Sequence, residues 1–203
     1  MKIYDFKLAP NPRRVRIFLA EKGLTVPYEQ VDIFARKNRE APFLAKNPFG
    51  TIPVLELDDG TCISESVAIC RYFEEQHPEP PLFGRGAREK AEVEMWSRRI
   101  ELIFSQAVRM IWAHGSPLTA KVVQQIPENV EPNRRSAAKF LEALDRALSD
   151  RPFIAGERFS IADIGAFCSI DFGKNSIAIT PDPALASLAR WYAAVAARPS
   201  ASA

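Results

Sequence analysis

Residues 47–69 carry the most information about how this chain folds, and they read Asn47-Pro48-Phe49-Gly50-Thr51-Ile52-Pro53-Val54-Leu55-Glu56-Leu57-Asp58-Asp59-Gly60-Thr61-Cys62-Ile63-Ser64-Glu65-Ser66-Val67-Ala68-Ile69. Asn47-Pro48 and Gly50 favour a loop, because these residue types adopt turn conformations readily. The apolar run 54–57 is bounded by turn signals, and Asp58-Asp59-Gly60 is typical of a hairpin turn. The stretch therefore predicts a loop followed by a strand and a second strand.

The end of the stretch predicts a helix. Ser64 precedes an apolar run by three residues, which suits a helix start, and Glu65 is favoured in a first turn by the helix dipole. Pro53 stands at the start of the first predicted strand. Because proline has no N–H for the ladder, it belongs at an edge or at a special backbone site.

This stretch closely resembles the glutathione S-transferase family, whose thioredoxin-like domain carries N-P-x-G-x-[VI]-P-x-L, a D-G hairpin and then E-S-x-A-I. The match is found residue by residue at Asn47, Pro48, Gly50, Ile52, Pro53, Leu55, Asp59-Gly60, Glu65-Ser66 and Ala68-Ile69. The chain is identified as a member of bacterial cytosolic type, nearest to theta- and zeta-like members with serine or asparagine in the first loop.

The resemblance implies a glutathione site on this stretch. Pro53 would form a cis peptide bond, and Ile52 would pair with the cysteinyl backbone of glutathione. Glu65 and Ser66 would hold its γ-glutamyl end, since a helix N-terminus accepts a carboxylate and Glu65 can receive the ammonium. The alternative is an ordinary hairpin-to-helix joint with Ser64 as its N-cap.

The glycyl end of glutathione is less clearly provided for. Thr51 belongs to the predicted glutathione-binding residues, but it stands where many family members have Lys or Gln for the glycyl carboxylate. Lys46 and Arg36 are weaker candidates for the same role.

The group that stabilises the thiolate in this family lies just after the first strand. Aligning residues 14–17 with the family's R-x-R-[IL] helix start places that position at Ala9, where serine or cysteine is usual. Alanine cannot donate to a thiolate, which puts activity in doubt. Asn11 is the candidate catalytic residue, because its amide is a donor near the helix entrance. The alternative is an Asx-turn before Pro12.

Three arginines follow in the same helix. Arg13 and Arg14 would add positive charge near the helix start, where a thiolate is helped by a lowered pKa. For Arg14 and Arg16, a solvated face of an amphipathic helix is the favoured interpretation.

An acceptor site for a small hydrophobic electrophile is expected between the domains, lined by the first loop and the long helix. The alternative is that the apolar residues at helical spacing belong to the hydrophobic core, as they do more often than not, and that the arginine among them extends to solvent. The candidates in this chain are Leu8, Arg109 and Trp112.

Residues 1–78 predict a thioredoxin-like α/β domain with a four-stranded mixed sheet. Strands are expected at 2–6 and at 26–33, with a helix from Pro12 to Gly23 between them. The predicted hairpin and helix complete the order strand, helix, strand, helix, strand, strand, helix.

Residues 79–86 predict a stiff proline-rich linker, and 87–203 an all-helical domain. One long helix is expected over 87–114 and another over 133–148, with an irregular piece between Pro127 and Pro132. Ser160 and Asp163 match the family's [ST]-x-x-D capping motif, a folding element with no catalytic role. A last helix is expected within 183–199.

The composition excludes several classes of function. The net charge is +2 from 27 basic and 25 acidic residues, which indicates neither nucleic acid nor a membrane surface as partner. No apolar run approaches the about 20 residues of a membrane span, and no leader pattern begins the chain. The three cysteines have no metal-like spacing, so no metal site is expected. We expect a reducing, cytoplasmic location.

The sequence thus predicts a homodimeric glutathione transferase that uses glutathione as co-substrate and conjugates its thiolate to small electrophiles. Glutathione-dependent reduction of disulfides or peroxides is a close variant. The alternative from another class is a glutathione-binding or protein-interaction module that keeps the fold without catalysis.

Overall fold

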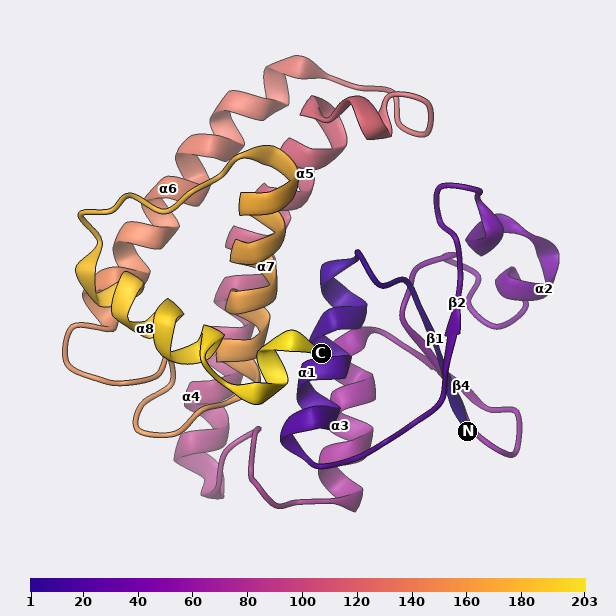
Figure 1. Cartoon of the computed structure of the whole chain (residues 1–203), viewed down its shortest axis with the longest axis horizontal. Coiled ribbons are helices and arrows are strands. Elements are labelled where there is room, and N and C mark those ends of the chain that lie inside the picture. The colour runs from indigo at the N-terminus through magenta and orange to yellow at the C-terminus, as the bar shows by residue number, and fades with distance from the viewer. The chain divides into compact units, whose positions relative to one another are not determined.

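The computed structural model describes residues 1–203, which divide into two compact units (Figure 1). Unit 1 comprises residues 1–82 together with 199–203, and unit 2 comprises 83–198. Unit 1 is a thioredoxin-like domain with a four-stranded mixed sheet and unit 2 is helical, so the predicted fold class is confirmed. The return of the last five residues to unit 1 is a feature that the sequence prediction did not contain.

The sheet of unit 1 has the strand order β2-β1-β3-β4. Strand β1 pairs in parallel with β2 and antiparallel with β3, which pairs antiparallel with β4. On one side of this sheet, helices α1 and α3 pack against each other, while the short helix α2 lies away from them (Figure 1). The strands are β1 (Lys2–Asp5), β2 (Tyr28–Gln30), β3 (Val54–Glu56) and β4 (Cys62–Ser64).

The second strand is shorter than predicted. It was expected over 26–33, but β2 covers only three residues, all exposed, among them Tyr28 with an exposed fraction of 40%. Val26 and Val31, which flank β2, are buried instead. Burial is thus achieved by the residues on either side of an edge strand, which is why the apolar run overestimates the strand length.

Apart from the short α2, the helical elements of unit 1 begin and end at proline or polar residues. They are α1 (Pro10–Glu21), η1 (Lys37–Arg39), α2 (Ala41–Leu44), α3 (Ser66–Gln76) and η5 (Pro199–Ser202). Helix α1 begins two residues earlier than the expected Pro12, and Gly23 follows its end with a φ of 66°. Proline is tolerated at both positions 10 and 12, because first-turn N–H groups have no partner within the helix.

The predicted N-cap of α3 is wrong. Ser64 is the last residue of β4, and Glu65, with a φ of 70°, is the N-cap of a helix that starts at Ser66. No side chain caps this helix. The strand continues through Ser64 because it pairs with Val54 of β3, and pairing in the sheet outweighs the local preference for a cap.

Unit 2 is built from five α-helices and a π-helical segment. They are α4 (Gly86–Arg99), η2 (Ile100–Ser105), α5 (Gln106–Gly115), α6 (Val130–Ala147), α7 (Ile161–Ile177) and α8 (Ala186–Ala196), with short 3₁₀ turns η3 (Pro117–Thr119) and η4 (Pro127–Asn129). None of these or the other helices is long and apolar enough to cross a membrane.

The helix expected over 87–114 is interrupted by the π-helical η2. A π turn holds more residues than an α turn, so it shifts the face that an apolar stripe presents. Leu102 is therefore 65% exposed and Ile103 is exposed as well, whereas Ile100 and Phe104 are buried.

Helix α6 starts at Val130, three residues before the predicted start. Pro132, expected to lie in an irregular piece, is the third residue of the helix. Its ring is accepted there because the N–H that it lacks would have no partner in the first turn.

Helix α7 is the buried centre of unit 2, and side chains cap its start. Asp163 accepts the N–H of Ser160 at 2.9 Å, which forms the predicted capping box. The same carboxylate accepts the Ile154 N–H at 2.9 Å and the Trp191 Nε1–H at 2.8 Å. Burial raises the pKa of the Asp163 carboxyl against these hydrogen bonds.

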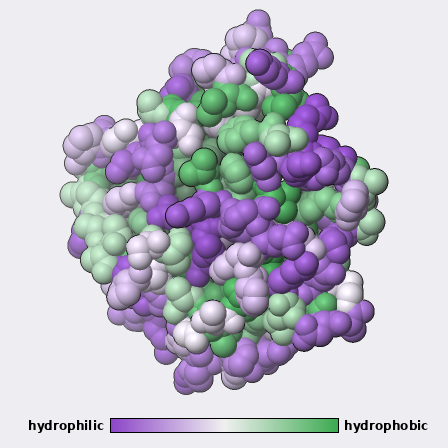
Figure 2. All heavy atoms as spheres, turned by 45° about the vertical axis from the view of Figure 1, so that its right-hand side comes forward, coloured by the Kyte–Doolittle hydropathy of each residue, from purple (hydrophilic) through white to green (hydrophobic).

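On the face drawn in Figure 2, hydrophobic residues reach the surface in several groups separated by hydrophilic ones. The most exposed large apolar side chains in the chain are Phe49, Leu8 and Leu102.

Candidate functional site

The β3–β4 hairpin brings the two ends of the stretch 47–69 together. Val54 pairs with Ser64, so Ile52-Pro53, just before β3, lies beside Glu65-Ser66, just after β4. The Ile52–Pro53 peptide bond is cis, as the resemblance implies. Two sequence segments named for glutathione binding therefore meet at one edge of the hairpin.

The backbone of Ile52 is available for an incoming peptide. Its side chain packs against the buried cluster of Tyr4, Val31, Phe43 and Val54, which fixes its position. No hydrogen bond within the protein occupies its N–H or its C=O. These groups can pair with an extended peptide as a neighbouring strand would.

The loop that leads to Ile52 is held by Asn47. This buried side chain donates from Nδ2 to the Thr51 carbonyl at 2.8 Å and to Thr51 Oγ1 at 2.9 Å, and its Oδ1 accepts the Phe49 N–H at 3.2 Å. Gly50 has a φ of 61°, and a Cβ there would approach the Asn38 carbonyl to 2.8 Å. The loop is thus built without freedom for a larger residue at position 50.

The start of α3 presents Glu65 and Ser66. Glu65 is exposed, and its left-handed backbone places it at the N-cap without a side-chain hydrogen bond. Ser66 is buried, and its Oγ accepts a hydrogen bond of 2.6 Å from Arg14 Nη1. The helix N-terminus adds partial positive charge, so an anionic group is favoured here.

The start of α1 presents Asn11. Ala9 is the N-cap and offers no side-chain hydrogen bond, while Asn11 is the exposed second residue of the helix. The Asn11 Oδ1 accepts from Arg14 Nη1 at 3.3 Å, so the alternative of an Asx-turn before Pro12 is not what this side chain forms. Its Nδ2 makes no hydrogen bond within the protein.

Two of the three arginines of α1 were interpreted wrongly. Arg14 is only 4% exposed, and Arg16 forms an ion pair of 2.5 Å with the buried Asp5. Arg16 also donates to the Lys7 carbonyl at 2.9 Å, which fixes the loop that follows β1. Arg13 donates to the Ala201 carbonyl at 2.9 Å. The helix face was therefore misjudged, and none of these side chains is simply solvated.

A signal for Arg14 is present in the sequence. Residues three and four positions apart share a helix face, and Ile17 and Phe18 follow Arg14 at these spacings. Both are buried, so a charged residue on this face has to be buried with them. The pattern could have identified Arg14 as an internal polar group.

Comparison with known proteins decides the family. A model of the glutathione S-transferase N-terminal domain matches residues 3–81, and one of the glutathione S-transferase C-terminal domain matches residues 96–199. The chain belongs to the glutathione S-transferase family. This family uses glutathione as co-substrate.

Three similar transferase proteins illustrate the match. Glutathione S-transferase 2 of Saccharomyces cerevisiae is 36% identical over 98% of this chain and 87% of the relative. The structure of Gtt2 from the same yeast has a TM-score of 0.94 at 34% identity, covering 100% of this chain and 99% of that one. A glutathione S-transferase domain-containing protein of Marinobacter aquaeolei VT8 has a TM-score of 0.93 at 39% identity, with coverages of 98% and 99%.

The residues expected at the glycyl end of the transferase site have partners within the protein. The Thr51 hydroxyl accepts from Asn47, as described. Lys46 pairs with Glu56 at 3.0 Å, and hydrogen bonds from Tyr4 and Lys46 lower the pKa of the Glu56 carboxyl. Arg36 is exposed in a left-handed turn.

The predicted acceptor-site residues belong to both units of this transferase. Leu8, in unit 1, is 72% exposed. In unit 2, Arg109 is exposed and donates from Nε to Gln106 Oε1 at 3.0 Å, while Trp112 makes an edge-to-face contact with Phe172. Their joint role stays a prediction.

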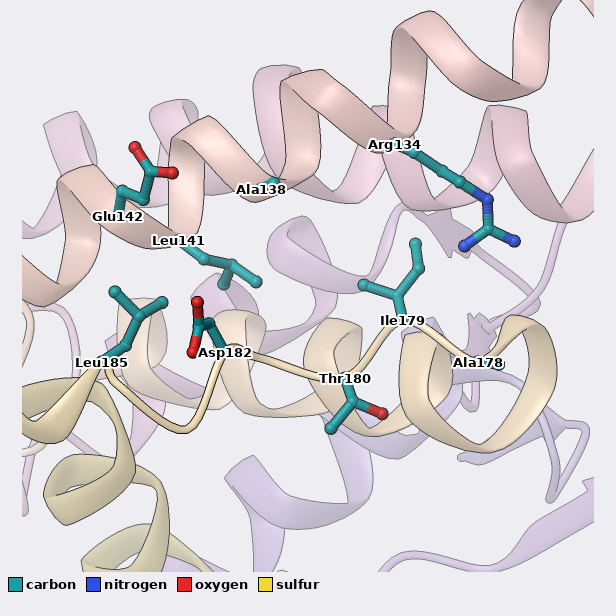
Figure 3. A pocket seen from close by; sticks show the side chains of 9 residues that line it. All are labelled: Arg134, Ala138, Leu141, Glu142, Ala178, Ile179, Thr180, Asp182 and Leu185. Atoms are coloured by element: carbon teal, nitrogen blue, oxygen red, sulfur yellow. The ribbon is translucent and has the colours of Figure 1, made fainter.

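Two pockets of unit 2 are lined by other residues. One of about 280 Å³ lies between α6 and the segment after α7, with Arg134 near one end and Glu142 and Asp182 near the other (Figure 3). A smaller one of about 170 Å³ lies between the end of α7 and α8. Neither is lined by Arg109 or Trp112, so neither corresponds to the predicted acceptor site. No group of three or more His, Cys, Asp or Glu side chains is placed to hold a metal ion.

Proposed function

We propose that this transferase binds glutathione in unit 1 and activates its thiol for attack on a small hydrophobic electrophile. The observation that carries the proposal is the meeting of two uncapped helix starts through Arg14. Asn11 of α1 and Ser66 of α3 accept hydrogen bonds from the same guanidinium nitrogen, so the two starts lie within reach of one tripeptide.

Each part of glutathione has a partner in this arrangement. The free N–H and C=O of Ile52 pair with the cysteinyl backbone, next to the cis bond at Pro53. Ser66 and the α3 N-terminus receive the α-carboxylate of the γ-glutamyl residue, and Glu65 receives its ammonium. Thr51 would contact the glycyl end.

The thiol is activated by donors at the start of α1. A free cysteine thiol has a pKa of about 8.5, and donors and a helix N-terminus lower it. The unpaired Nδ2–H₂ of Asn11 and the backbone N–H of the same residue are such donors, because Pro10 and Pro12 have no N–H and Ala9 contributes no side-chain donor. The thiol proton is released to solvent, and the thiolate forms a sulfur–carbon bond with the electrophile. An aryl halide loses its halide in this step, whereas an isothiocyanate adds the thiolate and takes up a proton, and the glutathione conjugate then dissociates.

Two alternatives to the transferase would use the same binding site, one of them an enzyme and the other not. Attack of the thiolate on a disulfide or peroxide would make the protein a glutathione-dependent reductase. Ala9 favours a different candidate, a binding or interaction module without catalysis, since the position that usually carries serine or cysteine has no functional group.

The test is the pKa of glutathione when bound. Thiolate absorbance near 240 nm, titrated against pH at saturating glutathione, should show a thiol pKa below the free value. Asn11→Ala should raise this pKa and lower kcat/KM about tenfold, because one neutral donor contributes about 1.4 kcal/mol. Activity would be followed with an aryl halide, an isothiocyanate, a peroxide and a disulfide.

An unshifted thiol in the wild type would leave the binding module as the function. Ala9→Ser is the matched gain-of-function variant, because it places a hydroxyl at the position usual in the family and should lower the thiol pKa further.

The protein is also proposed to be a cytoplasmic homodimer, as is typical of the family. With a chain mass of 22.7 kDa, light scattering at micromolar concentration should give about twice this mass.

A further inference from the structure

Arg14 is a buried cation without an anionic partner. It is 4% exposed, and Nη1 donates to Ser66 Oγ at 2.6 Å and to Asn11 Oδ1 at 3.3 Å. Both acceptors are neutral, and no carboxylate forms an ion pair with this guanidinium. A buried charge is costly unless it is paired, so the arrangement is complete only when an anion is present.

Two other basic residues of unit 1, whose side chains are largely shielded from solvent, differ from Arg14 in this respect. Arg16 pairs with Asp5 at 2.5 Å, and Lys22 pairs with Glu74 at 2.5 Å. Each of these basic side chains thus has a carboxylate within the protein. Arg14 is the one whose counter-ion has to come from elsewhere.

The two hydrogen bonds of Arg14 also determine which groups of Ser66 and Asn11 remain free to donate to a ligand. A guanidinium has only donors, so Ser66 Oγ has to accept from it, and the Ser66 O–H is left to donate elsewhere. In the same way, the Asn11 amide turns its oxygen toward Arg14, which leaves its NH₂ group pointing away as a donor.

We propose that Arg14 is the positioning residue of the glutathione site, which orients both the Ser66 hydroxyl and the Asn11 amide as donors toward bound glutathione and is electrically balanced by the γ-glutamyl α-carboxylate. This inference rests on the proposed function. It assigns to one side chain a link between the two ends of the site: the carboxylate end through Ser66 and the thiol end through Asn11.

A direct consequence is that Arg14 and the ligand carboxylate are energetically coupled. The probe is a pair of ligands, glutathione and its analogue γ-aminobutyryl-cysteinyl-glycine, which lacks only the α-carboxylate. Titration calorimetry with wild type and Arg14→Gln then forms a double-mutant cycle between one side chain and one ligand group.

For Arg14→Gln, glutathione affinity should fall about 10- to 100-fold, because a hydrogen-bonded charge interaction is lost. The affinity for the analogue should fall only about threefold, since it has no carboxylate to lose. Arg14→Lys retains the charge without the fork of donors. Arg14→Lys should therefore bind glutathione more tightly than Arg14→Gln does, while the pKa of the bound thiol should stay above the wild-type value.

The matched control is Arg88→Gln in α4, which makes the same change at a surface arginine that pairs with Glu92. It should leave the affinity ratio of the two ligands and the thiol pKa unchanged. Thermal unfolding of each variant identifies any that does not fold, and Arg14→Lys keeps the cycle measurable if Arg14→Gln unfolds.

Equal losses for both ligands would overturn the inference, because a purely structural arginine affects them alike. A variant that binds glutathione as the wild type does would overturn it too. In both cases the proposed function stands, since the wild type still binds glutathione and lowers its thiol pKa. A wild type that binds neither ligand would overturn the proposed function and this inference together.

Discussion

Helices α3 and α7 start with the same kinds of residue but use them in opposite ways. At α7, Ser160 and Asp163 are buried, and Asp163 accepts hydrogen bonds from Ser160, Ile154 and Trp191. At α3, Glu65 is exposed and no side chain caps the helix, while the Ser66 hydroxyl has one partner, a buried arginine.

The difference separates stability from binding. When every donor around a helix start is satisfied within the protein, the group stabilises the fold and has nothing left for a ligand. When a helix start leaves its N–H groups and a hydroxyl without internal acceptors, it gives up a cap of about 1 kcal/mol and gains affinity for an anion. We therefore expect substitutions at α7 to change stability, and substitutions at α3 to change affinity.

The largest effect should come from Asp163→Ala. Four buried donors, two of them on Ser160, lose their acceptor. Each unsatisfied group costs about 1–3 kcal/mol, so the free energy of unfolding should fall by at least about 4 kcal/mol. For a chain of this length the midpoint of thermal unfolding should fall by about 10 °C. Glutathione affinity, measured below that transition, should not change.

Asp150→Ala is the control, since Asp150 is exposed and pairs only with its neighbour Arg151. It should change the free energy of unfolding by less than about 0.5 kcal/mol. A loss of the same size in both variants would contradict the special role of the α7 start.

The second effect concerns affinity at α3. Ser66→Ala and Glu65→Ala each remove one charge-assisted contact, so each should weaken glutathione binding by about 1.5–3 kcal/mol, measured by titration calorimetry. Ser64→Ala is the control in the same segment, because this serine ends β4 and is not assigned to the ligand. If both Ser66→Ala and Glu65→Ala bound like the wild type, the site would be wrongly assigned.

The smallest effect concerns a third helix start, that of α4. Glu89 accepts the Arg85 N–H at 2.8 Å and pairs with Arg158 through both carboxylate oxygens, and these contacts hold its pKa below the ordinary value. A lowered folded-state pKa stabilises the fold above the unfolded pKa of about 4.3 and loses this contribution as the pH falls further. Because these groups are partly exposed, Glu89→Gln should cost only about 0.5–1 kcal/mol at pH 7.

Urea unfolding at pH 7 and at pH 3 measures this difference, which should be smaller at pH 3. Glu92→Gln, which breaks an exposed pair with Arg88, should cost less at pH 7. A pH-independent difference for Glu89→Gln would mean that its carboxylate charge has no part in stability.

The sequence was most informative where local signals and packing agree. The 58–60 hairpin turn and the Ser160–Asp163 capping box are specified by neighbouring residues, and both are found as predicted. The cis bond at Pro53 was implied by the resemblance to the family, and it is found as well. The order of strands and helices could be predicted for the same reason.

The remaining features depend on contacts that are distant in sequence. Arg14 meets Ser66 across 52 positions, so its burial cannot be judged from its own helix alone. The strand ends at Ser64 because of its pairing with Val54, and the π-helical η2 displaces Leu102 from the apolar stripe that a regular helix would give. Each error arose where tertiary contacts outweighed a local preference.

The return of residues 199–203 to unit 1 has a mechanical consequence. Ala201 accepts from Arg13 and Ser200 donates to Glu21, so η5 is held on α1. Both ends of the chain therefore belong to one unit, and unit 2 is a loop of chain that leaves and re-enters it. A force that pulls on the two termini would act within unit 1, on the pairing of β1 and on the contacts between η5 and α1, and unit 2 would carry tension only after η5 had detached.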